Sequence, residues 1–273
     1  MKRSKLIFLF SQLKQTFMNI KKHIPNLLTL GNLLCGTIAT IVAVNGDYLM
    51  AASLVVLGIV FDFFDGFAAR MLNVSGELGK QLDSLADMVT SGVVPGIIMF
   101  KFFGSNLFID AEKISNAAES KGIAVCFTGI NNSYLPYLGL LLTLAACYRL
   151  AKFNIDTRQS DSFIGLPTPA MSLFVIALPL IPMYSDNQFF IDLVQNNYFL
   201  IGVTLVLSFL MNAEIPLFSL KFKTFGVKEN LLKYVFLALS VVLLFTLEVI
   251  AIPAIIILYV ALSVGSNLSM NRA

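Results

Sequence analysis

The stretch DFFDGFAARMLNVSGELGKQLDSLAD, residues 62–87, places four aspartates in a region of the chain that is otherwise apolar. A helix advances by about 100° per residue, so Asp62 and Asp65 share one face of a helix. Asp83 and Asp87, four residues apart, share a face of the next helix. The stretch therefore predicts two helices that each carry a pair of carboxylates.

The short segment NVSGE, residues 73–77, joins these two helices. Helices joined so tightly are expected to lie antiparallel and to pack together, with the four carboxylates around one cavity. Such a cluster needs protons or divalent cations to neutralise it, and oxygen ligands suit hard ions such as Mg²⁺ or Mn²⁺. Mg²⁺ typically binds a few carboxylates together with substrate phosphates, so the pattern favours a metal–phosphate site.

The composition excludes an ordinary soluble domain. Of the 273 residues, 57% are hydrophobic and 13% are charged, and the mean hydropathy is +0.82. Soluble domains have about 25% charged residues, so this chain has too little polar surface for a water-facing globule. The three cysteines suggest neither a disulfide framework nor a zinc site, because their number is odd and no C-x-x-C occurs.

The hydropathy pattern predicts an all-α integral membrane protein. A spanning helix needs about 20 apolar residues, and about eight such runs follow an N-terminal amphipathic helix, residues 1–23, expected to lie in the membrane interface. We expect a catalytic transmembrane core over 24–213 and additional transmembrane helices over 214–273. A count of seven spans is the nearest competitor. The eight expected spans are 26–45, 47–73, 79–103, 133–156, 166–185, 197–213, 230–247 and 249–267.

Charge placement predicts the orientation. With the N-terminus inside, all of the 19 Lys and Arg residues except Lys101, Lys113 and Lys121 fall on the cytoplasmic side, as the positive-inside rule requires. The turn within residues 62–87 falls on the same side, so the aspartate cavity should open to the cytoplasm.

The aspartate stretch reads D-x₂-D-G-x₂-A-R-x₈-G-x₃-D-x₃-D, and every fixed position is filled. This pattern resembles the signature of the CDP-alcohol phosphotransferase family, which implies a helical membrane enzyme that makes a phosphodiester from a CDP-linked lipid and an alcohol, with release of CMP. The resemblance implies that Asp62, Asp65, Asp83 and Asp87 hold a divalent metal pair, with Asp87 also acting as general base. It further assigns the CDP-lipid to Gly66, Ala69, Arg70, Gly79, Asn26 and Thr29, with Arg70 on the phosphates.

Three other stretches bear on the acceptor. IPNLLTLGNLLCG (24–36), CYRLAKFN (147–154) and FIGLPTPA (163–170) resemble the phosphatidylserine synthase branch, although Lys152 stands where that branch has arginine. The implied acceptor is L-serine, and the implied serine-binding residues are Arg149, Lys152 and Phe153. Arg149 and Lys152, three residues apart near the end of the fourth span, suit a carboxylate; they could instead be anchors at the membrane interface.

The sequence leaves other functions open. Glycerol 3-phosphate or inositol phosphate could replace serine in the same chemistry. An intramembrane prenyltransferase also uses acidic helices, and a cation carrier could use buried carboxylates, although no paired interrupted helices support a carrier. The expected partners are CDP-diacylglycerol, L-serine, membrane lipid and a second copy of the chain in a homodimer, and no nucleic acid. The expected location is a bacterial or archaeal cell membrane.

Overall fold

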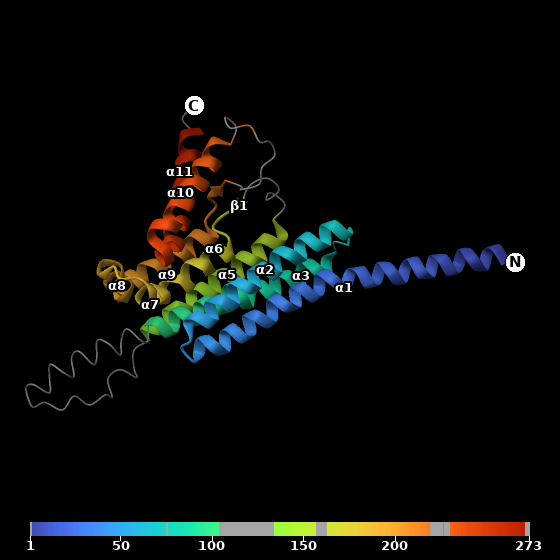
Figure 1. The fold of residues 1–273 in the computed structure, drawn as a ribbon, viewed down its shortest axis with the longest axis horizontal. Helices are drawn as coiled ribbons and strands as arrows, with labels where there is room; N and C mark the ends of the chain where they lie inside the picture. Colours follow the sequence, from blue (N-terminus) through green and yellow to red (C-terminus); the bar gives the residue numbers. More distant parts are fainter. Residues whose placement is uncertain are drawn as a thin grey trace, which may run out of the picture.

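The computed structural model describes residues 2–74, 76–103, 134–156, 163–218, 226 and 230–270, which are almost entirely helical (Figure 1). The prediction of an all-helical chain is confirmed except for one short antiparallel strand pair. The main helices are α1 (Lys2–Val44), α2 (Tyr48–Leu72), α3 (Glu77–Asp87), α5 (Leu141–Ile155), α6 (Thr168–Ala177), α7 (Ile181–Tyr184), α8 (Gln188–Gln195), α9 (Asn197–Asn212), α10 (Leu231–Leu247) and α11 (Ala251–Met270). The π and 3₁₀ segments are η1 (Met88–Val93), η3 (Leu135–Leu140), η4 (Leu178–Leu180) and η5 (Glu248–Ile250), and the strands are β1 (Phe163–Ile164) and β2 (Pro216–Leu217).

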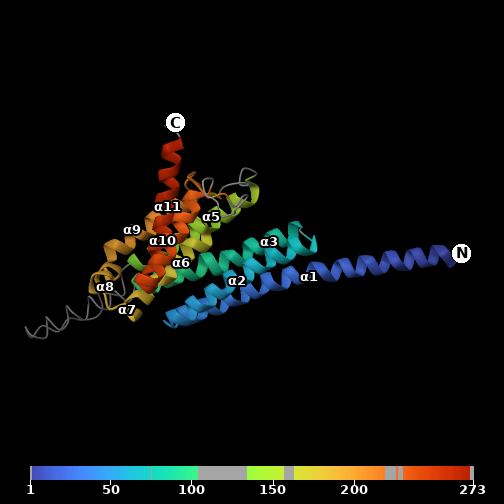
Figure 2. The same cartoon turned by 45° about the horizontal axis from the view of Figure 1, so that its top comes forward.

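Helix α1 is continuous from Lys2 to Val44, with Pro25 inside it. Its N-terminal part extends beyond the rest of the bundle in both views (Figures 1 and 2). The sequence predicted a separate interfacial helix over residues 1–23 before the first span. No break separates the two, so this division is not confirmed.

Two glycines allow α1, α2 and the third helical segment to approach closely. A Cβ atom added to Gly58 on α2 would come 2.8 Å from Asn32 Oδ1 of α1, and one added to Gly36 would come 2.9 Å from the Cα of Thr90. These separations are too short for real Cβ atoms, so only glycine fits at the two positions. The close contact brings polar side chains of α1 against both aspartate-bearing helices.

The third helical segment contains an irregularity that sequence periodicity did not predict. The helix runs from Glu77 to Phe103, but its central part η1 is a π-helix that begins directly after Asp87. A π-helix holds an extra residue in its turn and is often found at functional sites. The predicted tight turn before this segment is present: Asn73 adopts a left-handed conformation (φ 53°), and its N–H donates to the Arg70 carbonyl.

Within the described ranges, five segments are long and apolar enough to cross a membrane: His23–Val44, Tyr48–Leu72, Glu77–Phe103, Leu135–Ile155 and Leu231–Asn267. The last of these contains two helices. The Phe236 and Tyr259 ring centroids lie 5.7 Å apart, whereas 23 residues of straight helix would separate them by about 34 Å. The chain therefore reverses near Glu248 into the α10–α11 hairpin, which stands across α1–α3 in both views (Figures 1 and 2).

Two further apolar segments fall short of a simple span. Helices α8 and α9 are bent by 73° relative to each other, and Thr168–Tyr184 is a shorter apolar helix. The predicted count of eight spans is therefore not confirmed by length and composition. Large exposed apolar side chains on the first two helices, such as Leu34 and Phe63, nevertheless fit a bilayer better than water.

Gly165 directly follows strand β1 and forms the turn that leads to α6. Strand β1 pairs with β2, Phe163 opposite Leu217 and Ile164 opposite Pro216, and Gly165 N–H donates to the Ile215 carbonyl. Gly165 has φ +74°, and an added Cβ would lie 2.5 Å from the Met211 carbonyl oxygen. The turn before α6 thus requires glycine for two reasons.

We expect Gly165→Ala to lower the free energy of unfolding by more than the roughly 2 kcal/mol that a left-handed non-glycine residue usually costs, because its added Cβ also meets the Met211 carbonyl oxygen. Thermal unfolding of the purified protein in lipid measures the effect. Gly46→Ala is the matched control, because Gly46 also has positive φ (+85°) but an added Cβ there meets nothing within 4 Å. Equal losses for both variants would contradict the close approach of Met211.

Candidate active site

Three aspartates form a compact carboxylate cluster. One carboxylate oxygen each from Asp62, Asp65 and Asp83 lies within 4.8 Å of the others. Asp65 is buried and the other two are half-buried. In the part of the chain that the structure describes, no Lys or Arg forms an ion pair with them. Three close carboxylates without a cationic partner fit a hard divalent cation such as Mg²⁺ or Mn²⁺.

Asp87 lies beside this cluster but has a different environment. It is within electrostatic range of Asp62, Asp65 and Asp83, yet it is not one of the three with converging ligand atoms. Its Oδ1 accepts a hydrogen bond from Asn32 Nδ2 at 3.2 Å. Three carboxylates thus converge as candidate metal ligands, whereas the fourth, that of Asp87, is hydrogen-bonded to the Asn32 amide.

Helix α1 supplies a polar stripe that contacts both pairs of aspartates. Thr29 Oγ1 donates to Asp65 Oδ2, and Asn32 donates to Asp87. Asn32 is fully buried and its backbone carbonyl accepts from Thr90 Oγ1 at 3.1 Å. No sequence motif assigned a role to Asn32. The spacing of Asn26, Thr29 and Asn32, three residues apart along an apolar helix, was the signal that could have identified it.

The cluster borders a cavity of about 310 Å³ between α1, α2 and α3. The sequence predicted that α2 and α3 pack together around a cavity, and a cavity does lie between them. The prediction did not include α1, which packs along α2 and against α3 and lines the same cavity. All six residues predicted to bind the CDP-lipid line this cavity, together with Asp65 and Asp83 of the cluster: Asn26, Thr29, Gly66, Ala69, Arg70 and Gly79.

The glycines leave the helix backbone open to this cavity. A Cβ atom added to Gly66 meets nothing within 4 Å, and one added to Gly79 meets only Asn26 Oδ1, at 3.6 Å. A ligand can therefore approach the backbone of α2 and α3 closely.

Two cations lie at the mouth of the cavity. Arg70 is exposed, and no ion pair to it is found within the described ranges. Lys80 donates from Nζ to the Asn154 carbonyl oxygen at 2.7 Å, and Ser84 Oγ hydrogen-bonds the Asn154 side chain. Lys80, which the sequence gave no role, thus ties α3 to α5, whereas Arg70 remains available to an anion.

The three residues predicted to bind serine lie on α5 in different environments. Arg149 is 7% exposed, its Nε has no hydrogen-bond partner, and its guanidinium carbon lies 6.0 Å from the centre of the Phe153 ring. The Arg149 charge interacts with that of Asp87. Lys152 instead forms an ion pair with Glu214 at 3.0 Å. Among these residues, Arg149 is the buried cation that faces the aspartates.

Comparisons with known proteins agree with the geometry. The family model of the CDP-alcohol phosphatidyltransferases matches residues 22–210, which include all four aspartates, the α1 stripe and Arg149. A CDP-diacylglycerol–serine O-phosphatidyltransferase of Bacillus subtilis is 32% identical over 160 residues, which cover 57% of this chain and 75% of the relative. A protein of the same name from Helicobacter pylori is 30% identical over 217 residues, 79% of this chain and 80% of the relative. An archaetidylserine synthase of Methanothermobacter thermautotrophicus is 28% identical over 166 residues, 60% of each chain.

Proposed function

Because the chain belongs to the CDP-alcohol phosphatidyltransferase family, we propose that it transfers the phosphatidyl group of CDP-diacylglycerol to L-serine. The products are phosphatidylserine and CMP. The observation that carries this proposal is the cavity, in which every residue assigned to the CDP-lipid lines the same space as Asp65 and Asp83 of the aspartate cluster. The names of the similar enzymes support serine as the acceptor.

The cavity would bind the head group of the lipid. The nucleotide would lie against the open backbone at Gly66 and Gly79. Asn26 would donate to its phosphates, while Thr29, whose hydroxyl donates to Asp65, lines the same wall of the cavity. Arg70 at the mouth supplies a fixed positive charge for the diphosphate. The acyl chains remain in the bilayer.

Asp62, Asp65 and Asp83 would hold the divalent cation, and Asp87 would complete a site for a second one. A bound Mg²⁺ or Mn²⁺ stabilises negative charge on the diphosphate and on the CMP leaving group. The residues around the cluster keep the carboxylates in place, since Thr29 fixes Asp65 and Asn32 fixes Asp87.

Asp87 would act as the general base. In the proposed reaction, the serine hydroxyl oxygen forms a bond to the phosphorus that bears diacylglycerol, and the bond from that phosphorus to the CMP oxygen breaks. Asp87 accepts the hydroxyl proton. Asn32 occupies Oδ1 of Asp87, which leaves Oδ2 to take the proton.

Arg149 would bind the serine carboxylate. It is a buried cation near Asp87 whose Nε has no partner, and a carboxylate there would satisfy it with a charge-assisted hydrogen bond. Lys152 and Phe153 would shape the same pocket, with Phe153 against the guanidinium.

We expect Arg149→Ala to raise the KM for serine by about tenfold to a hundredfold, since a hydrogen bond to a charged group is worth about 1.5–3 kcal/mol. The KM for CDP-diacylglycerol should change far less. Lys152→Ala is the comparison on the same helix, and its effect should be smaller because Lys152 is already paired with Glu214. Equal increases in both KM values for Arg149→Ala would favour a structural role.

The identity of the acceptor alcohol is tested by supplying different alcohols in the same assay. Purified protein in lipid receives CDP-diacylglycerol, Mn²⁺ or Mg²⁺, and either L-serine, glycerol 3-phosphate or inositol phosphate, and CMP release is measured. We expect release with serine alone. CMP release with a phosphorylated acceptor instead of serine would retain the phosphatidyl transfer but show that serine is not the acceptor. Consumption of prenyl diphosphate, or metal transport without CMP release, would contradict the family reaction.

The membrane topology stays a prediction. We propose eight crossings, both termini and the aspartate cavity on the cytoplasmic side, residues 1–23 at the interface, and a homodimer in a bacterial or archaeal membrane. The reversal near Glu248 and the apolar character of each helix support the eight crossings. A cysteine placed at residue 248 should react with an impermeant maleimide from outside the cell.

A further inference from the structure

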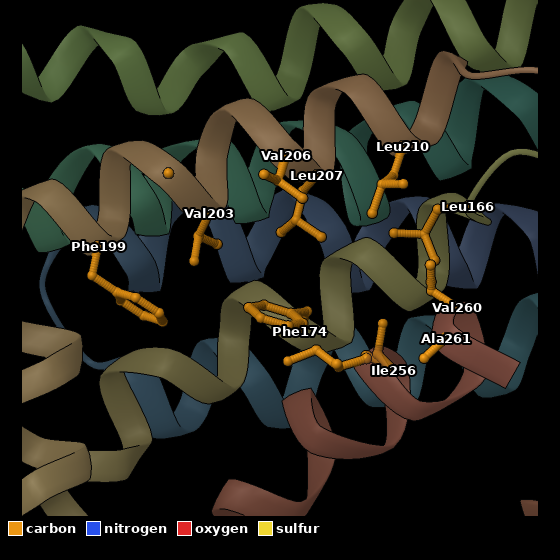
Figure 3. Close-up of a pocket in the computed structure, with 12 residues that line it drawn as sticks. Leu166, Phe174, Phe199, Val203, Val206, Leu207, Leu210, Ile256, Val260 and Ala261 are labelled. Carbon is orange, nitrogen blue, oxygen red and sulfur yellow. The ribbon is translucent and has the colours of Figure 1, made fainter. Parts of the chain in front are cut away.

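A second, larger cavity has no charged residue in its lining. It is a groove of about 500 Å³ between α6, α9 and α11, and all twelve residues that line it are apolar (Figure 3). Figure 3 shows Val203 and Leu207 of α9 pointing toward Phe174 of α6 and Ile256 of α11. A packed protein interior holds few voids larger than a water molecule, and the apolar walls of this groove favour an apolar occupant over water.

One face of α9 forms the long wall of the groove. The wall residues follow a helical repeat from residue 199 to residue 210, and these eleven steps correspond to about 16 Å of helix at 1.5 Å per residue. This length is close to half of the roughly 30 Å hydrocarbon core of a bilayer, or the depth of one leaflet. The residues of this wall are Phe199, Gly202, Val203, Val206, Leu207 and Leu210.

The groove opens toward the surroundings of the protein. Gly202 and Val206 on α9 are exposed, as are Ile257 and Ala261 on α11. A Cβ atom added to Gly202 meets nothing within 4 Å. The missing side chain of Gly202 therefore keeps the groove open at its exposed side.

The dimensions select the kind of occupant. A volume of about 500 Å³ spread over about 16 Å gives a mean cross-section of about 30 Å². An α-helix with its side chains is about 10–12 Å across, or roughly 80 Å² or more in section, so a helix from a second copy does not fit. A single hydrocarbon chain does, and the apolar walls offer no partner for a polar ligand.

The groove is separate from the active-site cavity. The two share no lining residue and no helix. Helix α6 packs against α2 as well as against α11 and α9, so it stands between the two sites.

We propose that this groove binds one acyl chain of a resident membrane phospholipid that is not the lipid undergoing reaction. The chain fills the space between α9 and α11 and joins the C-terminal hairpin to the catalytic bundle. This inference does not depend on the acceptor or on the proposed reaction.

Photo-cross-linking tests the proposal directly. The full-length protein is placed in nanodiscs that contain phosphatidylcholine with a photoreactive group on one acyl chain, and the adducts are mapped by mass spectrometry. We expect the wild-type protein to carry adducts in the segments 199–210 and 256–261, undiminished by excess CDP-diacylglycerol. Absence of adducts in these segments overturns the site, and loss of adducts on adding CDP-diacylglycerol shows that the occupant is the reacting lipid and overturns the resident lipid.

Substitutions that fill the groove provide the second test. Gly202→Phe should lower labelling of these segments by about tenfold, because displacing even two buried methylene groups costs about that factor. Ala261→Phe fills the groove from α11 and should act in the same way. Gly265→Phe is the matched control, since Gly265 also has open space around it but lies outside the groove. Equal labelling of Gly202→Phe, Ala261→Phe and Gly265→Phe contradicts the proposal.

Discussion

Asp87→Asn is expected to lower serine-dependent CMP release by about a thousandfold, within the range that general acid–base catalysis contributes. Asparagine has the shape of aspartate but cannot accept the hydroxyl proton. The Asn32 amide can still donate to the carbonyl oxygen of the new side chain, so the local structure should persist. Steady-state kinetics on the purified variant measures the loss.

Binding separates the two roles assigned to Asp87. If Asp87 is mainly a base, Asp87→Asn should bind CDP-diacylglycerol nearly as well as the wild type, as measured by equilibrium binding in the presence of metal. A variant that lost both turnover and lipid binding would show that Asp87 mainly holds metal. Asp87 lies outside the group of three converging carboxylates, which favours the first outcome.

Asp65→Asn is expected to weaken metal binding by about a hundredfold, because one charge-assisted ligand contributes up to about 3 kcal/mol. Activity at limiting Mn²⁺ should fall by a similar factor and recover in part as Mn²⁺ is raised. A chelator should abolish the activity of the wild-type protein, and added Mn²⁺ should restore it. Titration of activity against free metal measures each step.

Asp47→Asn is the matched control for this prediction. Asp47 caps the opposite end of the same helix, where its Oδ1 accepts from Met50 N–H at 3.0 Å, and asparagine caps helices about as well. This control should keep the metal dependence of the wild type. If Asp65→Asn titrated with metal as Asp47→Asn does, the carboxylate cluster would not be the metal site.

The aspartate stretch predicted its own local structure well. Its spacing placed Asp62 with Asp65 on one helix and Asp83 with Asp87 on the next, and the turn between them is present. The residues expected around the CDP-lipid line one cavity with the cluster. Such features follow from local helical geometry, which a sequence pattern records directly.

Contacts between distant segments could not be predicted in this way. The close approach of α1 depends on Gly36 and Gly58, which allow Asn32 to reach Asp87 across 55 positions of sequence. The ion pair of Lys152 with Glu214 joins segments 62 residues apart. The π-helix after Asp87 changes the helical repeat, and nothing in the hydropathy pattern marks that change.

The span count shows a similar limit. The hydropathy pattern located the apolar helices, but it does not give the angle at which one helix crosses another. It therefore could not show that the α10–α11 hairpin stands across the first three helices (Figures 1 and 2). Nor could it show the bend between α8 and α9. Both depend on how the runs pack, which is a property of the whole bundle.

The central claim is that serine attacks the phosphorus next to diacylglycerol at the aspartate site. L-Serine labelled with ¹⁸O in its hydroxyl group is supplied with CDP-diacylglycerol and Mn²⁺, and the products are weighed by mass spectrometry. The account predicts that phosphatidylserine retains the ¹⁸O, that CMP carries none, and that Asp87→Asn forms both products about a thousandfold more slowly. Formation of phosphatidic acid instead, or release of CMP that does not depend on serine, would contradict it.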